Sequence, residues 1–567
     1  MIRLLVLAVF VVSLPAQVPG VSSATTGSSA VNPSQTPAPA VKPEDRCKIV
    51  GSVLGAGTDA PLRKADVQLV PVQHQDTESP YGATTDGSGQ FVIENIDPGQ
   101  YRLMAERNGF VQGSYGDRGN SRGMGETLTL VAGQTMKDLT IKLVQQGVIT
   151  GRIADEDGDP LANVQVQCMR YAWMKGKREL MPSGGASTND LGEYRIFDLA
   201  PGKYFIKAIN QERFRWQPAP KGKAEEDYSP TYYPNASDAS NAAVVQITPG
   251  AQIRGIDMTL QKVRTVRITG HVLSASTGKP ARGAYLMLFN RTAGGYYSMI
   301  NGTSVRDSSG KFELHGVIPG AYILNVGKMG MSDREFYRQP IDVGTANIEN
   351  MNISLSPGAT IKGLISVESP GDIKNSTVQV FLRPKEPNPM GGAGSQGVQE
   401  DGSFTVENIV PNVYDAGVYG LPDGYYVKSF RLGDLDATNG PLDISQGIPG
   451  GAFKIVVSPN GAQIEGDVHD EKDRPATGVR VVLVPDSDHR AQTSLFSMAA
   501  TDQNGHFKIK GITPGKYKLF AWESIESGQY EDPDFLKSVE SSGTPVEFEE
   551  SAHATQALKL LPAPPDE

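Results

Sequence analysis

The histidines are the first residues to test for chemistry, because zinc hydrolases bind their metal through histidines and a nearby glutamate. A His-x-x-Glu pair would supply two such ligands. The chain has seven histidines. The residues three positions after them are Thr77, Ser274, Ile318, Lys472, Gln492, Ile509 and Gln556. None is an acid, so the sequence predicts no metallopeptidase centre and no metal ligand.

The segment Gly119-Asn120-Ser121-Arg122-Gly123 matches the G-x-S-x-G pattern of serine hydrolases. That motif requires a strand before the serine and a helix after it. Here a glycine-rich loop precedes the serine, and the strand-like segment 127–131 follows it. We interpret the segment as a loop, and we predict that the chain is not an enzyme and has no catalytic residue.

Three aspartates, Asp155, Asp157 and Asp159, resemble the start of a calcium loop. Pro160 occupies the place of the required glycine, and Val166 that of the bidentate acid. A hairpin turn is therefore the first interpretation, and weak calcium binding by the loop carboxylates is the alternative. No cofactor is expected.

Aromatic residues outside the repeated pattern are the candidates for binding. Trp216, Tyr228, Tyr232 and Tyr233 lie in a segment that lengthens one part of the chain. Aromatic rings exposed at the edge of a sandwich can stack on sugars, which predicts a carbohydrate-binding loop. In the alternative, the loop folds back and its rings pack on their own sheet. Trp522 directly follows a core strand and is expected to be buried.

The strands and turns that position these residues can be predicted from a sequence pattern that occurs five times. Each copy has an acidic or asparagine turn ending in glycine, an aromatic residue, alternating aliphatic residues and then Pro-Gly-x-Tyr. The copies end at Tyr101, Tyr204, Tyr322, Tyr414 and Tyr517. In the fourth copy, Asn412 replaces the glycine after proline.

Each part of the pattern predicts a local structure. The last glycine of the turn is expected to be left-handed in a hairpin loop. The aliphatic alternation slips by one residue before the proline, which predicts a bend or bulge. Pro-Gly fits a type II turn, whose second central residue needs a positive φ. The five tyrosines are expected to be core or corner residues.

A second signature, Gly-x-Val or Gly-x-Ile, precedes each turn and begins at Gly51, Gly151, Gly270, Gly363 and Gly466. About seven short strands in roughly 100 residues, with frequent turns, predict an antiparallel β-sandwich. These motifs resemble the carboxypeptidase regulatory-like domain, a prealbumin-like (transthyretin-like) sandwich related to Ig-like and carbohydrate-binding-like folds. In metallocarboxypeptidases this module accompanies the catalytic domain without contributing catalytic residues. The resemblance therefore implies an all-β chain of five tandem sandwiches with a non-catalytic role.

The expected organisation begins with a signal peptide over residues 1–24, because Arg3 precedes an apolar run and then small residues. A disordered linker rich in Ser, Ala and Pro follows over residues 25–46. The five sandwiches are expected over 47–146, 147–263, 264–357, 358–460 and 461–567. Only two cysteines are present, Cys47 and Cys168, and they fall in different repeats. They are expected to be separate thiols, with a bridge between neighbouring repeats as the alternative.

The charge and hydropathy of the chain limit the kinds of partner that it can bind. Lys+Arg 53 against Asp+Glu 63 gives a net charge of −10, which argues against nucleic acid. No later segment is apolar for long enough to cross a membrane. We expect an exported, periplasmic or extracellular scaffold or adhesion protein. The alternative is a carbohydrate receptor that uses the aromatic loop, and the expected partners are a polysaccharide or another envelope or extracellular protein.

Overall fold

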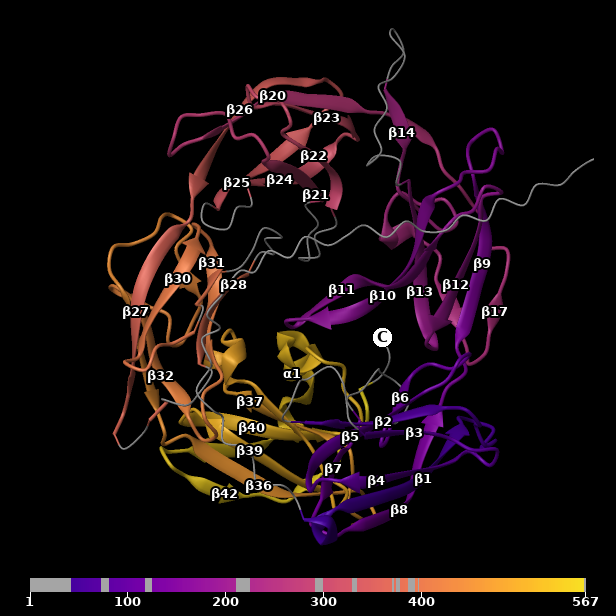
Figure 1. The fold of residues 1–567 in the computed structure, drawn as a ribbon, viewed down its shortest axis with the longest axis vertical. Coiled ribbons are helices and arrows are strands. Elements are labelled where there is room, and N and C mark those ends of the chain that lie inside the picture. Colours follow the sequence, from indigo (N-terminus) through magenta and orange to yellow (C-terminus); the bar gives the residue numbers. More distant parts are fainter. Residues whose placement is uncertain are drawn as a thin grey trace, which may run out of the picture. The chain divides into compact units, whose positions relative to one another are not determined.

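The computed structural model describes residues 42–72, 81–117, 125–210, 225–290, 299–328, 334–369, 372–373, 378–385, 393–395 and 397–564. Residues Pro43–Glu567 form one compact unit. Its regular secondary structure is almost entirely β-strand (Figure 1). The expected signal peptide, all but the last residues of the expected linker, and the segment 119–123 lie outside the described residues.

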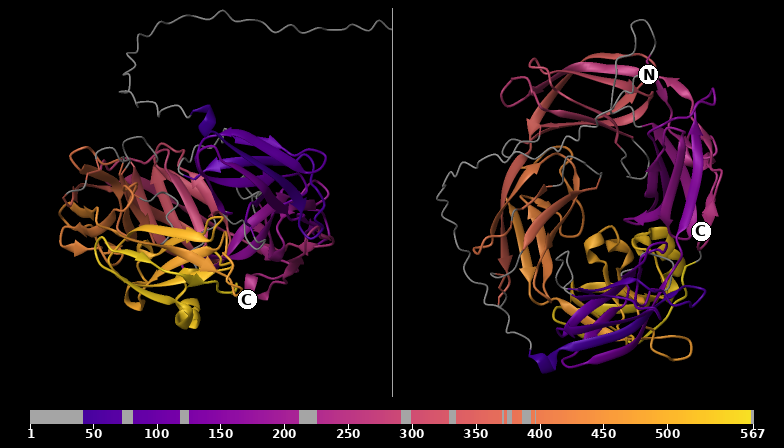
Figure 2. Two further views of the ribbon diagram at one scale, coloured as in Figure 1. Left: turned by 90° about the horizontal axis from the view of Figure 1, so that it is seen from below. Right: turned by 45° about the vertical axis from the view of Figure 1, so that its right-hand side comes forward.

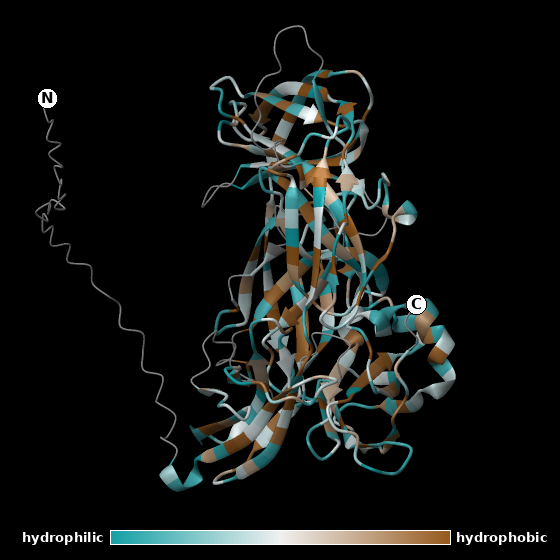
Figure 3. Cartoon of the chain, turned by 90° about the vertical axis from the view of Figure 1, so that its right-hand side faces the viewer, coloured by the Kyte–Doolittle hydropathy of each residue, from teal (hydrophilic) through white to brown (hydrophobic). Residues whose placement is uncertain are grey.

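Repeat one (47–146) shows the plan. Its strands are β1 (Cys47–Gly55), β2 (Asp66–Pro71), β3 (Tyr81–Thr84), β4 (Gln90–Ile96), β5 (Gly99–Glu106), β6 (Gly113–Ser114), β7 (Thr127–Leu130) and β8 (Thr135–Leu143). One sheet has the order β4-β1-β8 and the other β3-β2-β5-β6, with β7 also paired to β5. Alternate residues of β1 are buried, so one side of the strand faces the core. Hydrophobic and hydrophilic residues alternate in this way along many strands (Figure 3).

Repeat two (147–263) has the sheets β12-β9-β17 and β11-β10-β13-β15. In addition, β16 pairs with β13, β18 with β9 and β14 with β19. Its strands are β9 (Gly147–Ala154), β10 (Val164–Met174), β11 (Lys177–Ser187), β12 (Glu193–Leu199), β13 (Gly202–Asn210), β14 (Glu226–Tyr228), β15 (Thr231–Tyr232), β16 (Val245–Ile247), β17 (Gln252–Ile253), β18 (Met258–Thr259) and β19 (Lys262–Arg264), which ends one residue beyond the expected boundary.

Repeat three (264–357) forms one sheet of order β22-β21-β24-β25-β26-β20-β23, because β25 and β26 pair and join its two halves. Its strands are β20 (Val266–Ser274), β21 (Tyr285–Asn290), β22 (Met299–Ser304), β23 (Lys311–Val317), β24 (Gly320–Lys328), β25 (Glu335–Val343) and β26 (Ile348–Pro357).

Repeat four (358–460) has the sheets β30-β27-β35-β32-β33 and β29-β28-β31-β34. Its strands are β27 (Ala359–Val367), β28 (Gln379–Pro384), β29 (Ala393–Gly394), β30 (Ser403–Ile409), β31 (Val413–Tyr419), β32 (Tyr426–Leu432), β33 (Leu435–Asp436), β34 (Leu442–Asp443) and β35 (Phe453–Ser458).

Repeat five (461–567) has the sheets β39-β36-β42 and β38-β37-β40-β41, with β43 also paired to β36. Its elements are β36 (Ala462–His469), β37 (Arg480–Pro485), β38 (Ser497–Ala500), β39 (His506–Ile512), β40 (Gly515–Trp522), α1 (Pro533–Val539), β41 (Thr544–Phe548), β42 (His553–Thr555) and β43 (Leu558–Lys559).

The all-β sandwich architecture is confirmed, with one departure from purely antiparallel pairing. In each repeat the first strand pairs in parallel with a strand near the end of the same repeat: β1 with β8, β9 with β17, β20 with β26, β27 with β35 and β36 with β42. A parallel pair needs a long connection between its strands. The rest of each repeat supplies that connection.

The two signature motifs bond to each other in every repeat. The hairpin glycine is left-handed, with φ between 73 and 81° at Gly89, Gly192, Gly310, Gly402 and Gly505. Its carbonyl oxygen accepts a hydrogen bond from the first strand, and the five donors are the backbone N–H groups of Val53, Ile153, Val272, Ile365 and Val468. We call this bond the loop–strand lock. The predicted left-handed glycine is confirmed in all five copies.

The glycine of the Gly-x-Val motif lies opposite the aromatic residue that follows the hairpin. The cross-strand pairs are Gly51 with Phe91, Gly151 with Tyr194, Gly270 with Phe312, Gly363 with Phe404 and Gly466 with Phe507. A Cβ added at Gly270 would lie 1.8 Å from the backbone oxygen of Met351. Side chains are excluded there, which explains why this glycine recurs.

The corner tyrosines share one hydrogen bond. Each hydroxyl donates to the carbonyl oxygen four residues earlier: Tyr101 to Asp97, Tyr204 to Ala200, Tyr322 to Ile318, Tyr414 to Val410 and Tyr517 to Thr513, at 2.7–2.8 Å. All five tyrosines are buried. The expectation of core or corner residues is confirmed, and the hydrogen bond fixes the end of the preceding strand.

The type II turn predicted at Pro-Gly is wrong. Gly99, Gly320 and Asn412 do not have positive φ, and Gly202 and Gly515 have φ 154°, far from the value a type II turn needs. The left-handed residue lies three positions before the proline instead, at Asn95, Asp198, Gly316, Asn408 and Gly511, with φ between 59 and 69°. The strand register shifts beside it in all five repeats, which confirms the predicted bulge.

This bulge leads to a first prediction. Replacing Gly316 by valine is expected to lower the free energy of unfolding by about 1–2 kcal/mol, because a β-branched residue is strained at φ 66°. Replacing it by asparagine is expected to be nearly neutral, since Asn95 and Asn408 occupy the same place. A Cβ at Gly316 would meet only one atom, 4.0 Å away. The substitution therefore introduces backbone strain without a steric clash. Equal melting temperatures of Gly316→Val and Gly316→Asn would contradict the left-handed conformation assigned to this residue.

A carboxylate in repeat five leads to a pH prediction. Backbone N–H groups of Arg474 and Lys472, and the Arg474 side chain, bind Asp470 and lower its pKa to about 2. Because the pKa of Asp470 is lowered in the folded state, its ionised carboxylate stabilises the fold above pH 3.8, the ordinary pKa of the group. That contribution is lost as the pH falls toward 2. We expect Asp470→Asn to reduce the acid sensitivity of repeat five between pH 4 and pH 2, followed by hydrogen exchange at the amides of β36. The same acid dependence in variant and wild type would contradict this.

Repeat five also has a hydrophobic cluster outside its main core. Val482 and Val484 of β37 and Phe520 and Trp522 of β40 lie under the segment that carries α1, together with buried Ile525, Tyr530 and Leu536. The Trp522 side chain is 1% exposed, and its ring stacks on Phe520 with centroids 4.8 Å apart. The prediction that Trp522 is buried is confirmed. The helix, in yellow, was not predicted (Figures 1 and 2).

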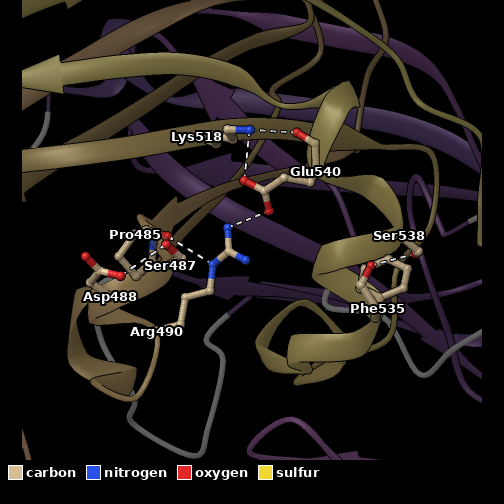
Figure 4. Close-up of polar contacts among 8 residues, drawn as sticks. All are labelled: Pro485, Ser487, Asp488, Arg490, Lys518, Phe535, Ser538 and Glu540. Carbon is tan, nitrogen blue, oxygen red and sulfur yellow. Dashed lines mark hydrogen bonds and ion pairs between the residues drawn. The ribbon is translucent and has the colours of Figure 1, made fainter.

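Polar contacts fasten this segment to the sheet (Figure 4). The Glu540 carboxylate accepts hydrogen bonds from Arg490 at 2.7 Å and from Lys518 at 2.8 Å. Lys518 also donates to the backbone oxygen of Glu540. Burial opposes ionisation of Glu540, but the two cations outweigh it and lower the pKa of this carboxyl. The helical segment is therefore a fixed part of repeat five.

Candidate binding surface on the second repeat

The candidate surface is built on two unusually long strands. β10 pairs with β13 only over Val164–Met169, whereas its pairing with β11 continues to Met174. Residues 170–181 therefore form a two-stranded ribbon beyond the sheet. Alternation along β10 directs Val166 and Cys168 into the core and Gln167, Met169 and Tyr171 to the other side.

Tyr228, a predicted sugar-binding residue, lies against the core of repeat two. Its hydroxyl donates to Asp155 Oδ2 at 3.3 Å, and the Lys262 ammonium lies 5.4 Å from its ring centroid. Burial raises the pKa of Tyr228, and Lys262 partly offsets this. The contacts of this ring are those of a packed side chain.

Tyr233 also packs against the core, whereas Tyr232 lies on the opposite side of the sheet. Tyr232 pairs with Lys207 of β13, whose ammonium lies 5.3 Å from the tyrosine ring centroid. Burial raises the pKa of Tyr232. Trp216 lies outside the described residues. Of the four predicted residues, only Tyr232 is placed on an outward surface.

The sequence analysis missed two aromatic residues beside Tyr232. Tyr171 and Phe205 form an edge-to-face pair with centroids 5.6 Å apart, and Arg178 lies 4.9 Å from the Tyr171 ring centroid. The signal was present: along β10, the positions that face away from the core change from Gln165 and Gln167 to buried Met169 and exposed Tyr171. It was not recognised because the position of the sheet edge could not be read from the sequence.

The loop with three aspartates is a turn. Asp155 Oδ1 accepts hydrogen bonds from the backbone N–H groups of Asp157 and Asp159. Burial opposes ionisation of Asp155, but these bonds and Lys262 lower its pKa overall. No cluster of potential metal ligands occurs within the described part of the chain. Weak calcium binding at this loop stays an untested alternative.

Cys47 and Cys168 are both buried and unpaired. Burial raises the pKa of the Cys168 thiol to about 12. A thiol with such a pKa is not a nucleophile near neutral pH. The interpretation as separate thiols is confirmed.

Among the described residues, all five repeats share the same structural motifs, and repeat two also carries an aromatic surface. This architecture defines a β-sandwich protein. Residues 48–144, in repeat one, match the model of the carboxypeptidase regulatory-like domain family. No curated protein matches the chain. In the described ranges, no helix has the length and apolar character needed to cross a membrane.

Solved structures with some similarity include a streptococcal ancillary pilin, with 13% identity, 55% of this chain and 98% of the pilin covered, and a TM-score of 0.19. The Bacillus anthracis TIE protein has 12% identity, 73% and 74% coverage, and a TM-score of 0.15. A minor pilin of Streptococcus agalactiae has 14% identity, 38% and 96% coverage, and a TM-score of 0.21. Nothing about the function of this chain follows from scores of this size.

Proposed function

We propose that this chain is a non-catalytic, exported scaffold or adhesion protein whose five repeats fold as five domains. The observation that carries this proposal is the fivefold use of the signature residues. In every repeat, the motif glycines, aromatics and tyrosines form the loop–strand lock, the glycine–aromatic pair and the corner hydrogen bond. These residues position strands, and their groups are occupied by backbone contacts.

A charged contact joins repeats four and five. Lys428 of β32 lies 2.8 Å from Glu368 and 2.7 Å from Glu550, and these carboxylates belong to different repeats. The Tyr426 hydroxyl donates to the same Glu550 at 2.7 Å. The two partners raise the pKa of Lys428, so this cation stays charged.

The proposed partners are a polysaccharide or another protein of the cell envelope or extracellular space. Carbohydrate binding through Trp216, Tyr228, Tyr232 and Tyr233 stays a second proposal. It now depends mainly on Tyr232, because Tyr228 and Tyr233 have core contacts. Export rests on the sequence features of residues 1–24.

Cell fractionation with cross-linking on intact cells tests this function. We expect the mature chain outside the cytoplasm, with cross-links to envelope polysaccharide or protein, and no turnover of peptide, ester or glycoside substrates. Recovery in the cytoplasm would contradict the export proposal. Turnover that persists in purified protein would contradict the non-catalytic role.

A further inference from the structure

The outward face of one sheet in repeat two carries a row of aromatic rings and cations. We call it the aromatic strip and define it as Tyr171, Phe205 and Tyr232 with Arg178 and Lys207. The sheet order β11-β10-β13-β15 places these residues on four neighbouring strands. With neighbouring strands about 4.8 Å apart, the strip extends over roughly 14 Å across the sheet.

Contacts between the side chains make the strip continuous. The Tyr171 and Phe205 rings meet edge to face, Arg178 covers the Tyr171 ring, and Lys207 covers the Tyr232 ring. Tyr171 is 37% exposed and Arg178 is exposed, whereas Phe205 and Tyr232 are half-buried and the stem of Lys207 is buried beside them. Cation–π contacts of this kind hold both ring and cation in position. The surface is therefore organised before any ligand binds.

The charge of the strip is opposite to that of the chain. The outward positions of β13 are Lys203, Phe205, Lys207 and Ile209, and those of β10 hold Gln165 and Gln167 but no acid. Asp238, near Tyr232, is occupied by hydrogen bonds from Ser240 and Asn241. The whole chain carries a net charge of −10, so a face with Lys203, Lys207 and Arg178 is a local excess of cations that favours an anionic ligand.

The functional groups of the strip fit a carbohydrate. Aromatic rings provide faces and edges for sugar C–H groups, glutamine amides can bond to hydroxyls, and arginine pairs with carboxylates. A peptide added as a further strand fits less well. The edge strand β11 contains Pro182, which lacks a backbone N–H, and a register shift beside it.

We propose that the aromatic strip binds a carboxylate-bearing polysaccharide, with Tyr171 and Phe205 against the sugar rings and Arg178 paired with a uronate carboxylate. The proposal goes beyond the scaffold role, and it rests on the second proposed function, carbohydrate binding by repeat two, because Tyr232 belongs to both. A chain with an overall negative charge should be repelled by a polyanion, so retention requires a specific surface.

Affinity electrophoresis of the full chain in gels with polygalacturonate or neutral dextran tests the proposal. We expect retention by polygalacturonate, weakened by salt, and none by dextran. Tyr171→Ala and Arg178→Gln should each weaken binding about tenfold, the effect of one charge-assisted contact or stacked ring. Both residues are exposed, so thermal unfolding should change little and reports whether each variant folds.

Phe197→Ala is the matched control. Phe197 is 59% exposed on β12, in the other sheet, and Arg195 lies 5.6 Å from its ring centroid. This variant should bind as well as wild type. Absence of wild-type retention, equal retention by dextran, or an equal loss in Phe197→Ala would each overturn the proposal. Full retention by folded Tyr171→Ala and Arg178→Gln would also overturn it.

Discussion

Replacing Gly270 by alanine is expected to unfold repeat three under conditions in which wild type is stable. The new Cβ would lie 1.8 Å from the backbone oxygen of Met351 and 2.9 Å from its nitrogen. A backbone atom cannot move aside as a flexible side chain can, so the parallel pair of β20 and β26 must separate. We expect a loss of roughly 3 kcal/mol or more in the free energy of unfolding.

Gly344→Ala in the same repeat is the control for Gly270→Ala. A Cβ at Gly344 would meet no atom within 4 Å, and the residue does not have a positive φ. Its thermal unfolding should match wild type. If Gly270→Ala were as stable as Gly344→Ala, the close approach of the two strands would be wrong.

Replacing Trp522 by alanine is expected to have a comparable effect in repeat five. The ring is 1% exposed and contacts both Phe520 and Phe535. Truncating a buried aromatic residue costs about 3–5 kcal/mol. Because Trp522 belongs to the outer cluster rather than the main core, α1 should detach before the sandwich unfolds.

Hydrogen exchange of the α1 segment measures this directly. In Trp522→Ala, amides of 533–539 should exchange much faster while those of β36 and β39 stay protected. A matched loss in both regions would show that the outer cluster and the main core form one cooperative unit. Tyr285→Ala is a useful comparison, because Tyr285 is 51% exposed in repeat three and its removal should be tolerated.

Local patterns in the sequence predicted much of the fold. The left-handed glycines such as Gly89, the slip before each proline and the buried tyrosines all depend on residues close together in the chain. The turn at Pro-Gly was misassigned because Asn95 and its counterparts, three residues earlier, also tolerate a positive φ. The residue after the proline and the residue three positions before it can both adopt a positive φ, and only the strand register shows which of them does.

The binding surface was harder to predict than the fold. The side of a sheet on which Tyr228 or Tyr232 lies depends on pairing between strands that are distant in sequence. Tyr171 was overlooked because the ribbon of β10 and β11 extends beyond β13, and no short motif marks that extension. The segment with α1 was missed because Val482 and Phe520 read as ordinary strand residues.

Native-state hydrogen exchange at five amides tests the central claim most directly, which is that one structural unit occurs five times. The N–H groups of Val53, Ile153, Val272, Ile365 and Val468 all donate to the hairpin glycine of their own repeat. The account predicts slow exchange at all five, comparable to the core strands of each repeat. Fast exchange at any of them, with the neighbouring strand still protected, would show that the loop–strand lock is absent from that repeat and would contradict the account.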